Sequence, residues 1–372
     1  MSIELLNKAL ARVIDPELRL PITELGMVGS VELSGSTASA QIKLTVVGCP
    51  ASAKIEADVT AALLSVEGVD STEIDMTVMT ANERAELKTK LRAGKPMRFN
   101  PFGTDALTRV FLVGSGKGGV GKSSVTANLA VALAARGLRV GLIDADIFGY
   151  SIPGQLGITE KPTKVDELIL PPVAFGVKVI SIGMFLENKQ PVAWRGPMLH
   201  RAVEQFLTDV FWGDLDFLLV DLPPGTGDVA ISLGQLLPTA KSIVVTTPQV
   251  AAAEVAERSG SVGLQTGQSV FGVIENMAWF EQADGSMLEI FGSGGGQSVA
   301  ARLTELSKAE TAVKVLGQIP ISMALREGSD AGVPVVVAQP KDSAAVALAV
   351  IAGEIAADKL GLAGRKLNLN LS

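Results

Sequence analysis

A glycine-rich segment at residues 114–124 carries the residue types that bind phosphate groups. Gly116, Gly121, Lys122 and Ser123 match the pattern G-x-x-x-x-G-K-[ST]. Glycines lack a β-carbon, so backbone N–H groups can approach phosphate oxygens closely, and the positive end of a following helix adds attraction. The sequence therefore predicts a nucleotide phosphate site, although a glycine-rich turn without a ligand would fit the same pattern. The predicted phosphate contacts are Gly116, Lys117, Gly118, Gly119, Val120, Gly121, Lys122, Ser123 and Ser124.

The charged and hydroxyl groups of this segment predict the chemistry of the site. Lys122 would place an ammonium group on the β- and γ-phosphates, and the Ser123 hydroxyl would ligate Mg²⁺. Lys117 needs its own interpretation, because an ordinary phosphate loop accepts almost any residue at that place. On the loop pattern alone, Lys117 could simply be a solvated lysine.

Three carboxylates follow apolar runs that are typical of buried parallel strands. Asp144 and Asp146 come after the run 139–143, and Asp221 follows the run 217–220. Because ligands bind at the carboxyl ends of parallel strands, these side chains are expected near the phosphates. We predict that Asp146 positions the attacking water, with Asp144 as the alternative, and that Asp221 holds Mg²⁺ through water. Each carboxylate could instead cap a turn or a helix.

Alternating strands and helices are predicted to position these groups. The run 109–113 is a short buried strand ahead of the glycines, and 125–136 is an Ala/Leu-rich helix that ends at Gly137. Strand, loop and helix in this order are what a phosphate site requires. With the later elements they predict an α/β fold with a mostly parallel, doubly wound P-loop NTPase sheet. These later elements are strands at 242–246, 270–274 and 313–319, and a closing helix at 343–357.

Other polar residues give weaker signals. Asn276 follows the strand predicted at 270–274, and its amide could hydrogen-bond an adenine edge or cap a turn. The only histidine, His200, lies in an apparent helix, and one histidine cannot form a metal site. The glycines at 292–296 have no Lys-Ser/Thr after them, which favours a loop that opens the next helix.

The first 81 residues predict a small α+β domain of αββαβ order. Apolar residues recur with helical spacing in 3–13, and a second helix is predicted at 51–64. Strands are predicted at 27–33, 38–46 and 69–78, the first two joined by a short turn.

Two polar features stand out in this domain. The triplet Asp15-Pro16-Glu17 is expected to be exposed, and it could simply end the first helix. Cys49 lies at the start of the second helix, whose dipole is expected to lower the thiol pKa. Cys49 could also be a small buried hydrophobe.

Length and composition limit the range of functions. The chain has 372 residues, which suffices for two or three domains, and its net charge of −7 argues against non-specific nucleic-acid binding. No apolar run approaches the roughly 18 residues of a membrane span, and no secretory signal is evident. The single cysteine excludes an intrachain disulfide and a Cys-rich metal site within one subunit. We therefore expect a cytoplasmic protein without a membrane or nucleic-acid partner.

Composition also suggests the domain bounds. The segment 82–95 is charged and could form a short solvated helix, and Gly and Pro residues follow it. The prediction is a domain at 1–81, a linker at 82–107, an ATPase domain at 108–362 and a tail at 363–372.

The loop GKGGVGKS at 116–123 resembles the deviant phosphate loop of the MinD/ParA/nitrogenase-iron-protein class. In that class the extra lysine, here Lys117, reaches the nucleotide of the partner subunit. The resemblance implies slow, dimer-dependent ATP hydrolysis, because a cation that arrives only on dimerisation stabilises the charge of the transferring phosphoryl group.

Further blocks resemble the Mrp/ApbC-type iron–sulfur carrier ATPases, and the first 81 residues resemble the SufT/PaaD-type iron–sulfur assembly domain. Together they cover nearly the whole chain. The resemblance implies a homodimer that takes ATP and Mg²⁺ and delivers iron–sulfur clusters to client apoproteins with other assembly proteins. It also implies that Asn276 contacts adenine and that Cys49, near Asp15, handles iron or a cluster. The blocks are 116–123, 144–149 (DADIFG), 194–198 (WRGPM), 221–228 (DLPPGTGD), 246–249 (TTPQ), 275–277 (ENM) and 317–320 (GQIP), with 15–17, 25–28 and 45–50 in the first domain.

One departure from the carrier pattern bears on function. Many members carry a C-x-x-C after the ENM block, with which two subunits bridge a cluster, but residues 278–285 contain no cysteine. Either Cys49 handles the cluster, or clusters are handled indirectly, or the cargo differs. A single thiolate cannot hold a cluster that normally takes four cysteine ligands, so Cys49 would act with a second subunit, a client or a small thiol.

Two other functions stay open at this point. One is a MinD/ParA-like positioning ATPase that binds membrane or DNA when ATP is bound. The other is an adaptor that binds no cluster itself and uses ATP to switch partner binding.

Overall fold

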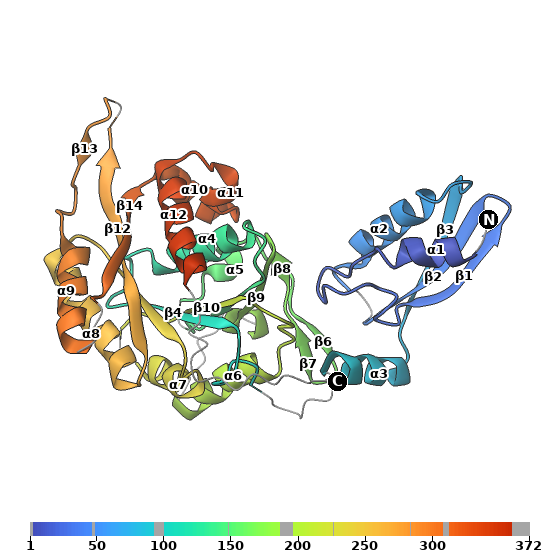
Figure 1. Cartoon of the computed structure of the whole chain (residues 1–372), viewed down its shortest axis with the longest axis horizontal. Helices are drawn as coiled ribbons and strands as arrows, with labels where there is room; N and C mark the ends of the chain where they lie inside the picture. Colours follow the sequence, from blue (N-terminus) through green and yellow to red (C-terminus); the bar gives the residue numbers. More distant parts are fainter. Residues whose placement is uncertain are drawn as a thin grey trace, which may run out of the picture. The chain divides into compact units, whose positions relative to one another are not determined.

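The computed structural model describes residues 3–46, 49–92, 100–147, 149–186, 196–225, 227–282, 284–307 and 312–358. The chain divides into two compact units (Figure 1). The first unit combines residues 1–99 with two later segments, 160–173 and 209–213, and the second holds the rest. The predicted tail at 363–372 and the start of the WRGPM block, Trp194 and Arg195, lie outside the described residues.

The first unit has the predicted αββαβ order around a three-stranded sheet. Its strand order is β1-β2-β3, with β1 and β2 antiparallel and β2 and β3 parallel. Alternate residues of β2 are buried, which is the period of two expected for a strand with one face on a core. The elements are α1 (Ile3–Leu10), β1 (Val28–Ser34), β2 (Thr37–Leu44), α2 (Ser52–Leu64) and β3 (Ser71–Val78).

A charged helix, α3 (Ala81–Arg92), follows in the segment predicted as a linker. It begins with a capping box, in which Glu83 Oε2 accepts from Thr80 N at 2.7 Å and Thr80 Oγ1 accepts from Glu83 N at 3.3 Å. Its Leu87 is buried in the core of the first unit. The sequence allowed a short solvated helix here, but Leu91 also packs against this core and Arg84 donates to Met79 O, so the helix is attached to the first unit.

A β-hairpin from the middle of the sequence also belongs to the first unit. Strands β6 (Thr163–Val165) and β7 (Leu168–Leu170) pair antiparallel. Val165, Leu168 and Leu170 are fully or nearly fully buried in the same core as the first 80 residues. No local pattern indicated this, because the hairpin buries its apolar residues against a partner distant in sequence. The predicted domain bounds stay a prediction. The structure adds that residues 160–173 and 209–213 group with the first unit.

The second unit contains a nine-stranded, mostly parallel sheet within the described residues. Its order is β13-β12-β11-β4-β10-β5-β9-β8, and β14 also pairs with β12. Strand β4 lies between β10 and β11, so its carboxyl end and the following loop lie at the middle of the sheet. The strands are β4 (Arg109–Ser115), β5 (Val140–Asp144), β8 (Val173–Ala174), β9 (Val177–Ser181), β10 (Phe217–Asp221), β11 (Lys241–Thr246), β12 (Ser269–Glu281), β13 (Met287–Leu288) and β14 (Lys314–Ile321).

Helices cover both faces of this sheet (Figure 1). One layer is built around α4, which contacts α5, α11 and α12, and the other runs through α6, α7, α8 and α9. The predicted α/β fold with a mostly parallel sheet is thus confirmed. The helices are α4 (Lys122–Ala134), α5 (Ile152–Gln155), α6 (Gly196–Thr208), α7 (Asp228–Leu236), α8 (Val250–Gln265), α9 (Gly295–Ser307), α10 (Met323–Ala331), α11 (Val335–Ala338) and α12 (Ser343–Ala357), with a short 3₁₀ helix at Ile182–Phe185.

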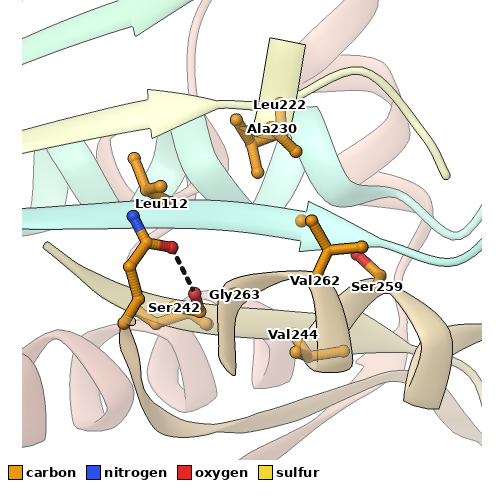
Figure 2. A pocket seen from close by; sticks show the side chains of 11 residues that line it. Leu112, Leu222, Ala230, Ser242, Val244, Ser259, Val262 and Gly263 are labelled. Atoms are coloured by element: carbon orange, nitrogen blue, oxygen red, sulfur yellow. Dashed lines mark hydrogen bonds between the residues drawn. The ribbon is translucent and has the colours of Figure 1, made fainter. Parts of the chain in front are cut away.

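Helix α8 packs closely against β4 and β11 (Figure 2). A β-carbon added to Gly263 would lie 2.6 Å from Ser242 Oγ, so a larger residue here would displace this hydroxyl. Ser242 Oγ in turn donates to Gln268 Oε1 at 3.3 Å. The void between these residues has a volume of about 20 Å³, which suffices for about one water molecule and excludes a ligand site.

None of the helices described is both long and apolar enough to cross a membrane.

Candidate phosphate-binding site

The glycine-rich loop connects β4 to α4 with the backbone that the sequence pattern requires. Gly119 and Gly121 both have φ of +80°, a region that favours glycine, and Gly121 is the N-cap of α4. A β-carbon on Gly121 would lie 2.3 Å from Asn276 Nδ2. By contrast, a β-carbon on Gly118 would meet nothing within 4 Å. Gly121 is therefore required both for its φ angle and for the approach of Asn276.

Lys122, Ser123 and Asp221 meet at the start of α4. Lys122 Nζ lies 2.7 Å from Asp221 Oδ2, and both side chains are buried. Ser123 Oγ donates to the same carboxylate oxygen at 2.6 Å, and Thr126 Oγ1 donates to Asp221 Oδ1 at 2.9 Å. The serine and carboxylate oxygens are the donor type that Mg²⁺ prefers, and they are adjacent, so the residues fit this metal.

Asp144 lies beside Asp221 but takes a different role in the local structure. The two aspartates are in register at the carboxyl ends of β5 and β10. Asp144 accepts hydrogen bonds from Asp146 N, Ile152 N and Ser181 Oγ, and it is fully buried. Burial, and next the charge of Asp221, raise the pKa of Asp144 to about 8. Its contacts are those of a turn-capping group.

Asp146 lines the cavity that the loop surrounds, whereas Asp144 does not. The cavity has a volume of about 270 Å³. Asp146 Oδ1 accepts from Gly149 N at 3.0 Å, which fixes the carboxylate at the cavity wall. The cavity is lined by the loop residues Ser115, Lys117–Ser124, by Asp146, Gly149, Ser151 and Gln155, and by Pro224 of the DLPPGTGD block.

Lys117 contacts its own subunit. Its Nζ donates to Gln249 Oε1 at 3.1 Å, at the N-terminus of α8. The loop is further fixed by Ser115, whose Oγ donates to Lys117 O and whose backbone oxygen accepts from Gly225 N at 2.8 Å. Gln249 belongs to the TTPQ block at 246–249, and its residue type alone predicted no role for it.

A larger and mostly apolar cavity of about 920 Å³ adjoins the phosphate cavity. The two cavities share the lining residues Gly121, Ser124, Ser151 and Gln155. Asn276 lies in its wall and is 3% exposed. Asn276 Nδ2 donates to Val120 O at 2.8 Å, and among the described residues its Oδ1 has no hydrogen-bond partner. Since a carbonyl can only accept, this contact fixes the orientation of the amide and leaves Oδ1 as an acceptor for a ligand.

Two wall residues of both cavities, Ser151 and Gln155, were missed by sequence reasoning. Gln155 Nε2 donates to Ser151 Oγ at 3.0 Å, and within the described part of the chain its buried Oε1 has no partner. They lie after β5 in and beside the short helix α5, with no motif of their own. Their only sequence signal was proximity to the aspartates at 144 and 146.

The first unit corrects two expectations. Asp15 and Glu17 are 3% and 8% exposed, so the prediction that this triplet is exposed was wrong. Asp15 Oδ1 accepts hydrogen bonds from the backbone N–H groups of Glu17 and Leu18. The residues therefore form a turn in which the Asp15 carboxylate is buried.

The expectation of a lowered thiol pKa for Cys49 was also wrong. Cys49 is 4% exposed, and burial, followed by the nearby Glu17 carboxylate, raises its pKa to about 11. The desolvation outweighs the backbone N–H groups at the start of α2, which act in the opposite direction. Among the described residues, no three His, Cys, Asp or Glu side chains are grouped so as to hold a metal ion.

The fold and the loop define the class of this protein as a P-loop NTPase. Residues 106–356 match the family of NUBPL iron-transfer P-loop NTPases, within the wider ParA group. Residues 5–76 match the iron–sulfur cluster assembly proteins. The chain belongs to this family of iron-transfer P-loop NTPases and carries the assembly domain in front, as the sequence blocks predicted.

Two curated relatives match this chain over more than nine-tenths of both lengths. The iron–sulfur cluster carrier protein of Mycobacterium tuberculosis is 52% identical over 367 residues, which cover 98% of this chain and 96% of the relative. That of Synechocystis is 39% identical and covers 92% and 94%. A nucleotide-binding protein from Archaeoglobus fulgidus in complex with ADP is 38% identical with a TM-score of 0.51, covering 60% of this chain and 86% of that one.

Proposed function

We propose that this protein binds and hydrolyses ATP as a nucleotide-dependent homodimer and delivers iron–sulfur clusters to client apoproteins. The observation that carries the proposal is the buried group of Lys122, Ser123 and Asp221 beside an open phosphate cavity. The similarity to cluster carriers over 98% of the chain supports the cargo.

The phosphate cavity supports a division of roles among its residues. The Lys122 ammonium would move from Asp221 to the β- and γ-phosphates. Ser123 and Asp221 would hold Mg²⁺, which neutralises charge on the phosphate oxygens. Asp146 would orient the attacking water, since its carboxylate lines the cavity and that of Asp144 does not. Asp144 would keep the strand ends in register instead.

The adjoining apolar cavity would take the nucleoside. Asn276 Oδ1 is an acceptor without a described partner, so it matches the amino group of adenine and would repel the carbonyl that guanine carries at that edge. This supports ATP as the nucleotide. Lys117 would reach the phosphates of the partner subunit and complete the partner's site.

Cluster binding would involve Cys49, the only cysteine of the chain. Its buried thiol is protonated, whereas the thiolate is the form that ligates iron. The side chain would therefore have to become exposed or less desolvated before it ligates iron. Two subunits supply two thiolates, so a client or a small thiol would complete the coordination.

Three measurements on anaerobically purified protein test this proposal together. Wild-type protein should hydrolyse ATP, gain visible absorption on reconstitution with iron and sulfide, and transfer the cluster to an apo-ferredoxin. Lys122→Ala should lose hydrolysis, and Cys49→Ser should lose the absorption. Protein that stays colourless but still hydrolyses ATP would refute cluster carriage and favour the adaptor function.

A further inference from the structure

The cation that would complete a partner's site is held within its own subunit. Lys117 Nζ donates to Gln249 Oε1 at 3.1 Å, and within the described ranges Lys117 forms no salt bridge. Because a lysine ammonium has only donors, the oxygen of the Gln249 amide must face it. Gln249 is the N-cap residue of α8, yet its side chain makes no capping hydrogen bond. The side chain thus serves Lys117 and leaves the helix end uncapped.

The packing of the loop fixes this meeting of Lys117 and Gln249. A β-carbon on Gly116 would lie 2.2 Å from the backbone carbon of Val255, so the loop rests directly on α8. The backbone oxygen of Lys117 is bound by Ser115 Oγ at 3.0 Å. With the loop and the helix held together, the Lys117 side chain starts within reach of the first residue of α8.

This contact is suited to a temporary hold. A hydrogen bond from an ammonium to a neutral amide is weaker than one to an anionic oxygen. The site is also at the N-terminus of a helix of 16 residues, where the helix dipole disfavours a cation. Phosphate oxygens that a second subunit brings within reach would therefore compete with Gln249 for Lys117.

We infer that Gln249 is a positioning residue, which keeps Lys117 in cis until the phosphate oxygens of a second subunit's nucleotide are in reach. This depends on the trans role of Lys117 in the proposed function. The hold would keep the Lys117 ammonium, which lies at the wall of its own phosphate cavity, away from its own nucleotide until the two subunits meet.

Substitution of Gln249 changes the strength of the hold in both directions. Gln249→Glu replaces the neutral acceptor by a carboxylate, so we expect ATP turnover at saturation to fall roughly tenfold with KM nearly unchanged. Gln249→Met has a similar shape without the acceptor, and turnover at low protein concentration should rise roughly threefold. Gln265→Glu adds the same charge at the exposed other end of α8 and should leave turnover as in the wild type.

The same substitution in a Lys117→Ala background separates positioning from a structural effect. Gln249→Glu should cause no further loss there, since the cation it holds is gone. An equal loss in both backgrounds, or wild-type turnover in Gln249→Glu, would overturn the inference while the proposed function stands. Wild-type turnover in Lys117→Ala alone would overturn the trans role and the inference with it. Thermal unfolding and binding of a fluorescent ADP verify that each variant is folded.

Discussion

At the residue scale, the site combines charges that stabilise one another only as a group. Asp221 is fully buried and has Lys122 as its cation, with Ser123 and Thr126 as hydrogen-bond donors. Removing one partner of a buried ion pair leaves the other charge without compensation. The residue that would bind phosphate is therefore also one that stabilises the fold.

Lys122→Ala should lower the free energy of unfolding by about 3 kcal/mol in the absence of nucleotide, because the Asp221 carboxylate stays buried without its cation. Urea unfolding followed by circular dichroism measures this. Lys161→Ala, at an exposed lysine, is the control and should change stability by less than about 0.5 kcal/mol. Equal stability of Lys122→Ala and wild type would contradict the ion pair.

Asp144 makes stability depend on pH. Its pKa is raised from 3.8 to about 8 by burial and by Asp221, so the folded state binds a proton that the unfolded state has released. The free energy of unfolding should therefore fall as pH rises between about pH 4 and pH 8, with a slope of at most about 1.4 kcal/mol per pH unit.

Asp144→Asn should remove this dependence, since the amide stays neutral at every pH. Thermal unfolding of the nucleotide-free protein across the pH range is the measurement. Asp105→Asn, at an exposed aspartate, should keep the wild-type slope. A slope that is the same in Asp144→Asn and in wild type would assign the titration to another group.

Cys49 should react slowly with alkylating agents. A pKa of about 11 leaves roughly a hundredfold less thiolate at pH 8 than an ordinary cysteine has, and burial slows the reaction further. Glu17→Gln should speed alkylation, because the Glu17 carboxylate contributes to the raised pKa, whereas Glu24→Gln at an exposed site should not. Mass-spectrometric rates of iodoacetamide labelling decide this, and rapid labelling of the native wild type would contradict the buried thiol.

At the element scale, the loop between β4 and α4 depends on one glycine. Gly121→Ala should weaken ATP binding at least about a hundredfold and cost about 2 kcal/mol of stability, because φ of +80° is strained and the methyl group meets Asn276. Gly103→Ala, where a β-carbon meets only the Asn100 backbone oxygen at 3.8 Å and which lies outside the cavity, is the matched control. Titration with a fluorescent ATP analogue compares the two. Similar affinities would show that the loop adopts another backbone.

The hairpin β6–β7 is the element that sequence reasoning could not place. Val165, Leu168 and Leu170 form a short apolar stretch in the sequence, and nothing in that stretch indicates that they pack against the first unit. Leu168→Ala should destabilise the first unit by about 3 kcal/mol and speed hydrogen exchange in residues 28–78, while Glu167→Ala at the exposed turn should not. Unchanged exchange in Leu168→Ala would mean that the hairpin does not stabilise this unit.

Other elements were predictable because their signals are local. β10 and α12 have the predicted bounds, since an apolar run ending in Asp221 and an Ala-rich helix need no distant partner to be recognised. β12 extends to Glu281, past the predicted 270–274, because pairing with β13 and β14 continues it. The phosphate loop was predictable from spacing, whereas the Lys117–Gln249 contact joins segments 132 residues apart and was not.

At the scale of the whole molecule, one chain combines two compact units. The phosphate cavity of the proposed nucleotide site is lined by residues of the second unit, and Cys49 belongs to the first unit. The family match spans both units, which supports a function that needs nucleotide turnover and cluster handling in the same protein. The central claim is that Lys117 acts on the nucleotide of a second copy.

Mixing two variants of strongly lowered turnover tests that claim most directly. Lys117→Ala keeps a site that lacks only the partner's lysine, and Asp146→Ala supplies that lysine but cannot orient its own water. An equimolar mixture should recover roughly a quarter of wild-type ATP turnover, because half of the dimers are mixed and each has one complete site. If Lys117 acts within its own subunit, the mixture will stay as inactive as the two variants alone, and the account is contradicted.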